Sequence, residues 1–120
     1  RYMGWAEQNV AESGGSLQVS HDIASAYAGA DVVYAKSWGA LPFFGNWEPE
    51  KPIRDQYKHF IVDEAKMALT NNGVFSHCLP LRRNVKATDG VMDSPQCIAI
   101  DEAENRLHVQ KAIMAALMQQ

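Results

Sequence analysis

Apolar side chains recur at helical spacing in several parts of this chain, three of which lie toward its two ends. Residues 2–13 form the first pattern, which ends at Gly14-Gly15, a pair typical of helix ends. The second covers 23–30 and follows Asp22, whose carboxylate can cap a helix by accepting backbone N–H groups. The third runs from 101 to about 118. The pattern therefore predicts helices near both ends of the chain.

Short runs typical of strands lie between these helices. The clearest are 31–35, which we expect to be a buried strand, and 74–78. Weaker candidates are 16–20 and 97–100. Because strands alternate with helices, the order predicts right-handed βαβ crossovers, a parallel sheet and the α/β fold class.

The middle of the chain is predicted to be a long loop followed by a charged helix. Residues 37–52 combine glycine, proline and aromatic side chains without a period, and this length is well beyond the ~4–6 residues of a typical loop. Residues 55–69 place apolar groups on one helical face, and Asn71-Asn72-Gly73 ends that pattern. The stretch 80–94 is expected to be irregular.

Unusual segments follow the predicted strands. They begin at Lys36, His77 and Asp101. In parallel sheets, ligands bind beyond the carboxyl ends of the strands. We therefore expect the functional site at this edge of the sheet.

Composition and charge exclude several classes of protein. The chain has 120 residues, of which 47% are hydrophobic, and a formal net charge of -3. Nucleic-acid and membrane-surface proteins need basic patches, so this balance argues against both. No apolar run approaches the roughly 20 residues that a membrane-spanning helix needs, and the start lacks the pattern of a signal peptide. These features predict a cytoplasmic protein.

Neither the cysteines nor the histidines predict a metal site. Cys78 and Cys97 form no disulfide framework and no paired ligand motif, so we expect reduced thiols. The histidines lack metal-ligand spacing. The chain begins with arginine, already inside a helical pattern, and we interpret it as part of a longer protein.

The most unusual stretch is VFSHCLPLRR, residues 74–83. Cys78 could be a nucleophile with His77 as its base, but neighbours on a strand point to opposite faces, which disfavours that pair. A buried thiol without chemistry is an equally open interpretation. A bend at Leu79-Pro80 would turn the Leu79 carbonyl toward the crevice, where it could accept hydrogen bonds from an amine.

Arg106 in the last predicted helix also has two interpretations. It could form a surface ion pair with Glu102, four residues earlier. It could instead reach into the crevice toward a carbonyl or phosphate oxygen.

Four features follow one another along the chain. They are VVYAKSW, an aromatic loop, HCLP (77–80) and EAENR (102–106). In this combination the chain resembles the ornithine carbamoyltransferase branch of the carbamoyltransferase family. The resemblance implies a Rossmann-like, three-layer amino-acid-binding domain with a parallel sheet. Residues 1–100 would form most of that domain, and 101–120 a helix returning toward a carbamoyl-phosphate domain. The family's phosphate-gripping Thr-Arg motif is absent from these residues.

The resemblance also implies an activity, which is carbamoyl transfer from carbamoyl phosphate without a cofactor. Cys78 and Leu79 would contact carbamoyl phosphate and the attacking amine. Arg106 would bind the carbamoyl oxygen, with help from His77. On this interpretation Cys78 is a contact and not a covalent nucleophile. Family members are typically trimers.

Lys36 departs from the ornithine branch, which carries an acid there to pair with the α-ammonium of the substrate. A lysine would repel that ammonium but suits an acylated substrate, whose only α-charge is its carboxylate. The departure resembles the acetylornithine branch and implies N-acetylornithine as substrate, with ornithine or N-succinylornithine as alternatives. A solvated lysine and a non-catalytic α/β binding module also stay open.

Two further expectations concern the surroundings of the pocket. Segment 37–52 resembles the family's closing loop, whose aromatic side chains would cover the substrate or pack a satellite core: Trp38, Phe43, Phe44 and Trp47. Lys86 matches a lysine that is carboxylated in the acetylornithine branch, although a surface lysine is the default interpretation.

Overall fold

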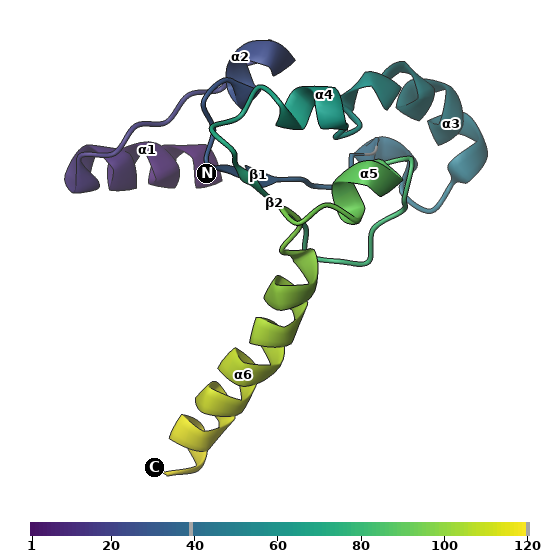
Figure 1. The fold of residues 1–120 in the computed structure, drawn as a ribbon. Coiled ribbons are helices and arrows are strands. Elements are labelled where there is room, and N and C mark those ends of the chain that lie inside the picture. Colours follow the sequence, from purple (N-terminus) through teal and green to yellow (C-terminus); the bar gives the residue numbers. More distant parts are fainter. Residues whose placement is uncertain (39, 120) are drawn as a thin grey trace.

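The computed structural model describes residues 1–38 and 40–119 (Figure 1). Helices surround a small parallel sheet, and η denotes a 3₁₀ helix. In chain order the elements are α1 (Tyr2–Ser13), α2 (Ile23–Tyr27), β1 (Val32–Tyr34), η1 (Leu41–Phe43), α3 (Trp47–Gln56), η2 (Lys58–Phe60), α4 (Glu64–Met67), β2 (Val74–Ser76), α5 (Asp89–Met92) and α6 (Ala99–Met118).

The sheet consists of β1 and β2, paired in parallel with Val33 opposite Phe75 and Tyr34 opposite Ser76. Helices α2 and α4 lie on one side of the strands in Figure 1, and α6 leaves on the other. This arrangement confirms the predicted α/β class and its parallel pairing. The carboxyl ends of both strands meet at one edge, where the site was expected.

A small core packs around the fully buried side chain of Phe75. It consists of Val62, Met67, Phe75, Ala87 and Val91. These residues come from β2, α4, α5 and the segments between them. The core therefore fixes β2 and the segment 86–91 relative to one another, which positions the site.

Several predicted boundaries are confirmed. Helix α1 ends at Gly14, whose φ of 71° lies in the left-handed region that glycine adopts without a steric penalty. Asp22 caps α2, since its carboxylate accepts hydrogen bonds from the N–H groups of Ala24 and Ser25. Strand β2 and helix α6 also lie where the pattern predicts them.

The predicted strands were wrong in three respects. Strand β1 is not buried, because Val32 and Tyr34 are 60% and 53% exposed on a strand that pairs only with β2 among the described residues. Residues 16–20 form no strand. Among residues 97–100, Cys97 alone forms a β-bridge, and its partner is Phe75. The Ile98 N–H donates to the Phe75 carbonyl, and α6 begins at the next residue, Ala99.

The predicted loop 37–52 was wrong in its second half, where α3 begins at Trp47. Glu48 and Glu50 lie in its first turn and Arg54 in its last, and each of these three charges suits the helix dipole. Pro49 occupies the first turn, where a missing N–H costs no intrahelical bond. The apparent lack of period therefore concealed a short polar helix.

The predicted helix 55–69 was also wrong, because Val62 interrupts it. The Val62 N–H donates to the Lys86 carbonyl at 2.9 Å, and the Val62 carbonyl accepts from the Thr88 N–H at 3.0 Å. Asp63 then caps α4 through the N–H of Lys66. Long-range backbone pairing thus overrides a helical pattern. Likewise the predicted irregular stretch 80–94 contains α5, capped by Thr88.

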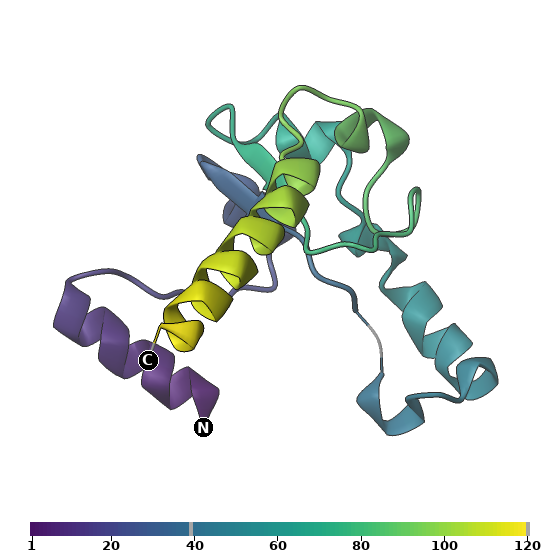
Figure 2. The same ribbon diagram turned by 90° about the horizontal axis from the view of Figure 1, so that it is seen from below.

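Helices α1 and α6 extend away from the body of the chain (Figures 1 and 2). The radius of gyration is 17.3 Å, whereas a compact domain of this length would have about 13–14 Å. No helix among the described residues is both long and apolar enough to cross a membrane.

Candidate active site

Lys36 and Cys78 meet at the carboxyl ends of the two strands. The Lys36 Nζ atom lies 3.3 Å from the Cys78 Sγ atom. The hydrogen bond from Lys36 is the largest cause that lowers the pKa of the Cys78 thiol, because the ammonium group stabilises the thiolate. The structure therefore brings together two residues that lie 42 positions apart in the sequence.

Arg106 reaches the same place from α6. Its Nη2 atom donates a hydrogen bond to the Cys78 carbonyl at 2.7 Å. The alternative ion pair between Arg106 and Glu102 is wrong, because the Glu102 carboxylate accepts hydrogen bonds from Tyr34 and Ser76 instead. The guanidinium group thus lies at the strand ends with donors available for a ligand oxygen.

His77 is buried and points one ring nitrogen at its own loop. The Leu79 N–H donates to Nδ1 at 2.9 Å, and no group in the described part of the chain pairs with the buried Nε2 atom. Burial is the largest cause that lowers the pKa of His77, followed by the charges of Lys36 and Lys86. A neutral ring whose Nδ1 accepts a hydrogen bond carries its proton on Nε2, which is therefore a free donor.

The disfavoured nucleophile–base pair is not formed. Cys78 contacts Lys36, and His77 contacts the Leu79 backbone, so no hydrogen bond joins their side chains within residues 1–38 and 40–119. Leu79 has a φ of 43°, and its peptide bond to Pro80 is cis. Leu79 therefore has a left-handed backbone conformation.

Lys86 is buried, so the default interpretation of a surface lysine is wrong. Its ammonium group lies 3.4 Å from the centroid of the Trp38 ring and donates to the Trp38 carbonyl at 3.3 Å. Burial is the largest cause that lowers the pKa of Lys86, and the positive charges of Arg54 and Arg82 lower it further. A lysine in this setting is a better nucleophile than an exposed one.

A hollow of about 650 Å³ separates the Lys86 loop from the start of α3. Trp38, Phe44, Trp47 and Lys86 are among the residues that line it. Phe44 and Trp47 are 90% and 57% exposed. The structure therefore gathers three of the four predicted lid aromatics around this hollow, whereas Phe43 does not line it.

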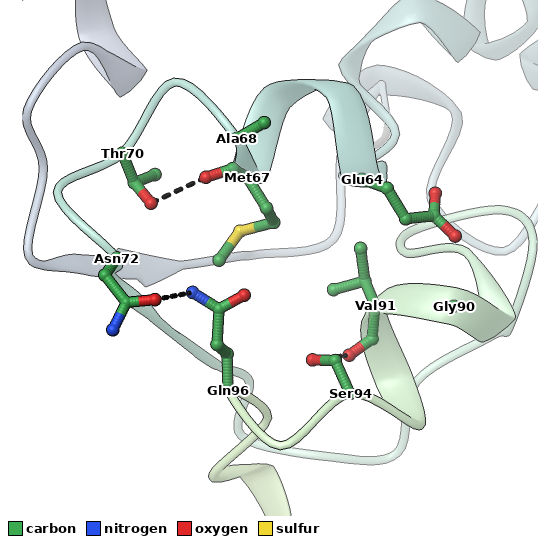
Figure 3. A pocket seen from close by; sticks show the side chains of 9 residues that line it. All are labelled: Glu64, Met67, Ala68, Thr70, Asn72, Gly90, Val91, Ser94 and Gln96. Atoms are coloured by element: carbon green, nitrogen blue, oxygen red, sulfur yellow. Dashed lines mark hydrogen bonds between the residues drawn. The ribbon is translucent and has the colours of Figure 1, made fainter.

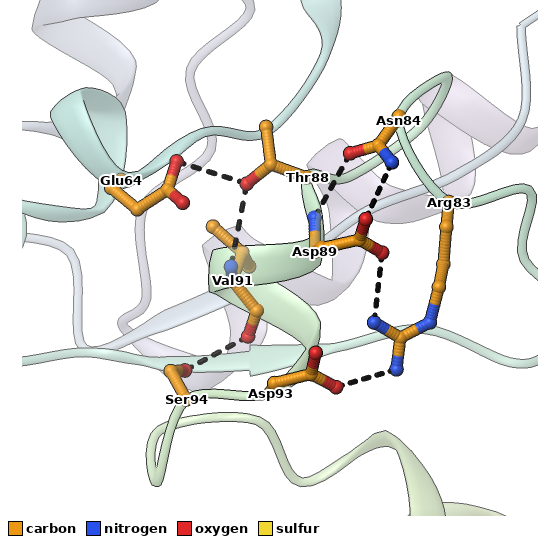
Figure 4. A network of polar contacts seen from close by, with 8 residues as sticks. All are labelled: Glu64, Arg83, Asn84, Thr88, Asp89, Val91, Asp93 and Ser94. Carbon is orange, nitrogen blue, oxygen red and sulfur yellow. Dashed lines mark hydrogen bonds and ion pairs between the residues drawn. The ribbon is translucent and has the colours of Figure 1, made fainter.

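The two arginines after the HCLP motif have different contacts. The Arg82 guanidinium lies 5.8 Å from the centroid of the Trp47 ring. Arg83 forms ion pairs with Asp89 at 2.9 Å and Asp93 at 2.6 Å (Figure 4). Arg83 therefore fastens the loop that carries Lys86 to α5.

A second hollow, of about 350 Å³, lies between α4 and α5 (Figure 3). Glu64, Thr70 and Gln96 are among the residues that line it. None of the predicted site residues does so. This hollow is therefore separate from the candidate site.

The sequence prediction missed the polar side chains that support the site. Tyr34 and Ser76 face each other in the strand register, and Glu102 contacts both. Partial desolvation of its hydroxyl group, then the hydrogen bond to Glu102, raises the pKa of Tyr34 to about 12. Glu50 is buried in α3, where it accepts a hydrogen bond from the Ala40 N–H. Polar residues at the ends of two neighbouring strands were the signal that could have revealed Tyr34 and Ser76.

The sequence profile described as "Aspartate/ornithine carbamoyltransferase, Asp/Orn binding domain" matches residues 1–117. The chain belongs to the aspartate/ornithine carbamoyltransferase family. This membership confirms the resemblance seen in the HCLP and EAENR motifs. Within the family's binding domain, the edge formed by Lys36, Cys78 and Arg106 is the candidate active site.

Relatives in two branches of the carbamoyltransferase family are similar to the chain. It is 92% identical over 120 residues to the N-acetylornithine carbamoyltransferase of Xanthomonas campestris pv. campestris, and covers 35% of that protein. It is 44% identical over 116 residues to the ornithine carbamoyltransferase of Pyrococcus abyssi, with 95% of the chain and 35% of that relative covered. The chain thus spans about a third of the length of these relatives.

Solved structures of carbamoyltransferases have the same fold. An acetylornithine transcarbamylase complexed with acetylcitrulline matches with a TM-score of 0.88 and 94% identity, over 98% of this chain and 35% of that one. A mutant of N-acetyl-L-ornithine transcarbamylase, complexed with carbamyl phosphate and N-succinyl-L-norvaline, matches with the same TM-score of 0.88 and 94% identity, and the same coverage of 98% and 35%.

Proposed function

We propose that the protein containing this chain transfers a carbamoyl group from carbamoyl phosphate to the δ-amine of N-acetyl-L-ornithine, giving N-acetyl-L-citrulline and phosphate. The observation that carries the proposal is the contact between Lys36 and Cys78 at the carboxyl ends of β1 and β2, beside Arg106. The 92% identity to a relative named N-acetylornithine carbamoyltransferase supports it.

Carbamoyl phosphate would be held at the HCLP turn. The Arg106 guanidinium and the free Nε2–H of His77 are donors suited to the carbamoyl oxygen, on which negative charge develops during attack. The lowered pKa of His77 favours the neutral ring, in which Nδ1 accepts from the Leu79 N–H and Nε2 carries the proton. Cys78 and the Leu79 carbonyl would contact the carbamoyl group and the incoming amine.

Lys36 would bind the amino-acid substrate through its α-carboxylate. An ammonium group attracts a carboxylate and repels an α-ammonium, so Lys36 favours a substrate whose α-amine is acylated. The partner of the Lys36 ammonium here is Cys78, 3.3 Å away. The same lysine thereby lies next to the residue proposed to contact the reacting groups.

The reaction needs orientation more than covalent catalysis. The neutral δ-nitrogen uses its lone pair to attack the carbamoyl carbon, and the tetrahedral centre then collapses. The carbon–oxygen bond breaks with its electron pair on phosphate, which can take the proton released by nitrogen. Positioning and electrostatic stabilisation of the oxyanion supply the acceleration, so Cys78 acts as a contact.

Lys86 would be carboxylated on Nζ in the active protein. Carbon dioxide reacts with a neutral amine, and burial together with Arg54 and Arg82 lowers the pKa of Lys86. The nitrogen lone pair bonds to the carbon atom and one nitrogen proton is released to solvent, so the product is a carbamate anion, which would be attracted by the same two guanidinium groups. Intact-protein mass spectrometry under mild conditions tests this step: an added mass of one carbon dioxide on Lys86 is expected, and its absence would contradict it.

We extend the proposal to the whole protein. Residues 1–100 would form most of the amino-acid-binding domain, and 101–120 a helix directed toward a carbamoyl-phosphate domain outside this chain. Trp38, Phe43, Phe44 and Trp47 would belong to a lid that closes on the substrate. The protein would work as a homotrimer in the cytoplasm, in arginine biosynthesis.

The test of the proposed function is product formation by the full-length protein. With carbamoyl phosphate and N-acetylornithine, we expect N-acetylcitrulline by mass spectrometry and phosphate in equal amount. Arg106→Ala should lower kcat by about 100-fold or more, as expected for loss of an oxyanion donor. A full-length protein that forms no carbamoylated product, and binds no bisubstrate phosphonate in calorimetry, would instead be a non-catalytic binding module.

A further inference from the structure

The Glu102 carboxylate connects three elements at the candidate active site. Its Oε1 atom accepts a hydrogen bond from the Tyr34 hydroxyl at 3.1 Å, and its Oε2 atom accepts one from the Ser76 hydroxyl. Tyr34 ends β1 and Ser76 ends β2, and the two are paired in the strand register. One side chain from the first turn of α6 therefore joins the ends of both strands.

These contacts are more than a favourable charge at a helix start. Asp101 lies in the same first turn and has the same charge, but it is exposed and its side chain forms no hydrogen bond among the described residues. Ser76 is only 5% exposed, so its hydroxyl needs a partner and Glu102 supplies it. The α6 backbone is tied to β2 close by, since the Ile98 N–H donates to the Phe75 carbonyl.

Glu102 and Arg106 are four residues apart and so lie on one face of α6. Such a pair would ordinarily form an intrahelical ion pair, which would hold the guanidinium group against its own helix. Here the carboxylate is occupied by two hydroxyl groups, and Arg106 donates to the Cys78 carbonyl at 2.7 Å. Glu102 thus fixes the helix against the strands one turn before the guanidinium group and leaves that group free to reach across.

We propose that Glu102 is a positioning residue, which aims Arg106 at the carbamoyl oxygen by joining α6 to the ends of β1 and β2. The inference rests on the proposed function, because it concerns the same site. Glu102 does not itself contact the reacting groups. Removing it leaves every group that contacts the substrate in the protein but releases the helix that orients one of them.

A double-mutant cycle in the full-length protein tests the inference. Glu102→Ala should lower kcat for carbamoyl transfer by about 10- to 100-fold, with a smaller change in KM, because a misplaced guanidinium acts on the transition state. In an Arg106→Ala background, the same change should cost less than about twofold, because the group that it positions has gone. Losses that simply multiply would overturn the inference.

Two further variants separate geometry from charge. Glu102→Gln can still accept from the Tyr34 hydroxyl and can donate to the Ser76 hydroxyl, so we expect activity within about threefold of the unmodified protein. Asp101→Ala removes a carboxylate from the same helical turn and should change kcat by less than about twofold. A Glu102→Gln variant as impaired as Glu102→Ala would contradict a positioning role.

A crystal structure of full-length Glu102→Ala decides the inference without reference to activity. We expect the Arg106 Nη2 atom to lie beyond about 3.5 Å from the Cys78 carbonyl, the limit for a hydrogen bond. A retained contact at hydrogen-bond distance would overturn the proposal. If the unmodified full-length protein lacks carbamoyl transfer, the proposed function fails, and this structure still tests the role of Glu102.

Discussion

Lys36 approaches the Cys78 thiol to 3.3 Å and lowers the pKa of that thiol, because its positive charge stabilises the thiolate. Replacing Lys36 by Met should therefore raise the pKa of Cys78 and shift its alkylation to higher pH. Iodoacetamide labelling of the full-length protein at several pH values, followed by peptide mass spectrometry of Cys78, gives the midpoint. An unchanged midpoint would show that Lys36 does not stabilise the thiolate.

Lys36 is also the residue proposed to bind the α-carboxylate of the substrate. Lys36→Asp should lower kcat/KM for N-acetylornithine by about 100-fold or more, since an attractive charge opposite the α-carboxylate becomes a repulsive one. Lys51→Asp is a suitable control, because Lys51 pairs only with Asp55 among the described residues and lies outside the site. Equal kcat/KM values for the Lys36→Asp variant and the unmodified protein would remove Lys36 from the binding site.

At the scale of elements, the close approach of β1 and β2 depends on Gly73. A Cβ atom at Gly73 would lie 2.6 Å from the Ala30 carbonyl oxygen and 3.0 Å from that of Asp31. These are backbone atoms, which cannot move aside without shifting the start of β1. We expect Gly73→Ala to lower the free energy of unfolding by about 1–3 kcal/mol, as overpacking does.

Urea denaturation of the full-length protein measures this effect. Gly15→Ala is the control, because its Cβ atom would meet only the Ser13 hydroxyl oxygen, at an ordinary 3.4 Å. We expect the control to change the unfolding free energy by less than about 0.5 kcal/mol. Equal stability of the two variants would contradict the packing argument.

Local signals in the sequence predicted some elements well and others poorly. Gly14 and Asp22 act through their immediate neighbours, so the helix ends that they mark were predictable. Val62 ends a helical pattern only because it pairs with the backbone at Lys86 and Thr88, a contact that periodicity cannot reveal. The burial of Lys86 under Trp38 depends on the same long-range pairing.

The candidate site was likewise predictable in part from the sequence. The meeting of Lys36 and Cys78 at one edge followed from the rule that parallel strands end together, whereas Arg106 reaches that edge from α6 through the Cys78 carbonyl. The hydrogen-bond partners of Glu102 could not be predicted in this way, because the choice between Arg106 and the strand hydroxyls depends on where α6 meets β2. Sequence reasoning thus predicted the edge of the sheet at which the candidate residues gather, and the structure was needed to assign their hydrogen bonds.

At the scale of the whole molecule, α1 and α6 leave large apolar side chains exposed, among them Trp5, Leu107, Ile113 and Leu117. The chain covers 35% of its relative from Xanthomonas campestris. We expect these side chains to be covered in the complete protein, and residues 1–120 alone to form no carbamoylated product.

Size-exclusion chromatography with light scattering should show a trimer for the full-length protein. Carbamoylated product formed by residues 1–120 alone would contradict the expectation that the rest of the protein is needed for activity.

If Lys36 selects an acylated substrate, the ratio of two specificity constants must show it. The full-length protein is assayed for kcat/KM with N-acetylornithine and with ornithine, at saturating carbamoyl phosphate. We expect N-acetylornithine to be preferred by about 100-fold or more, because ornithine presents an ammonium group to the lysine. An equal or higher kcat/KM with ornithine would contradict it.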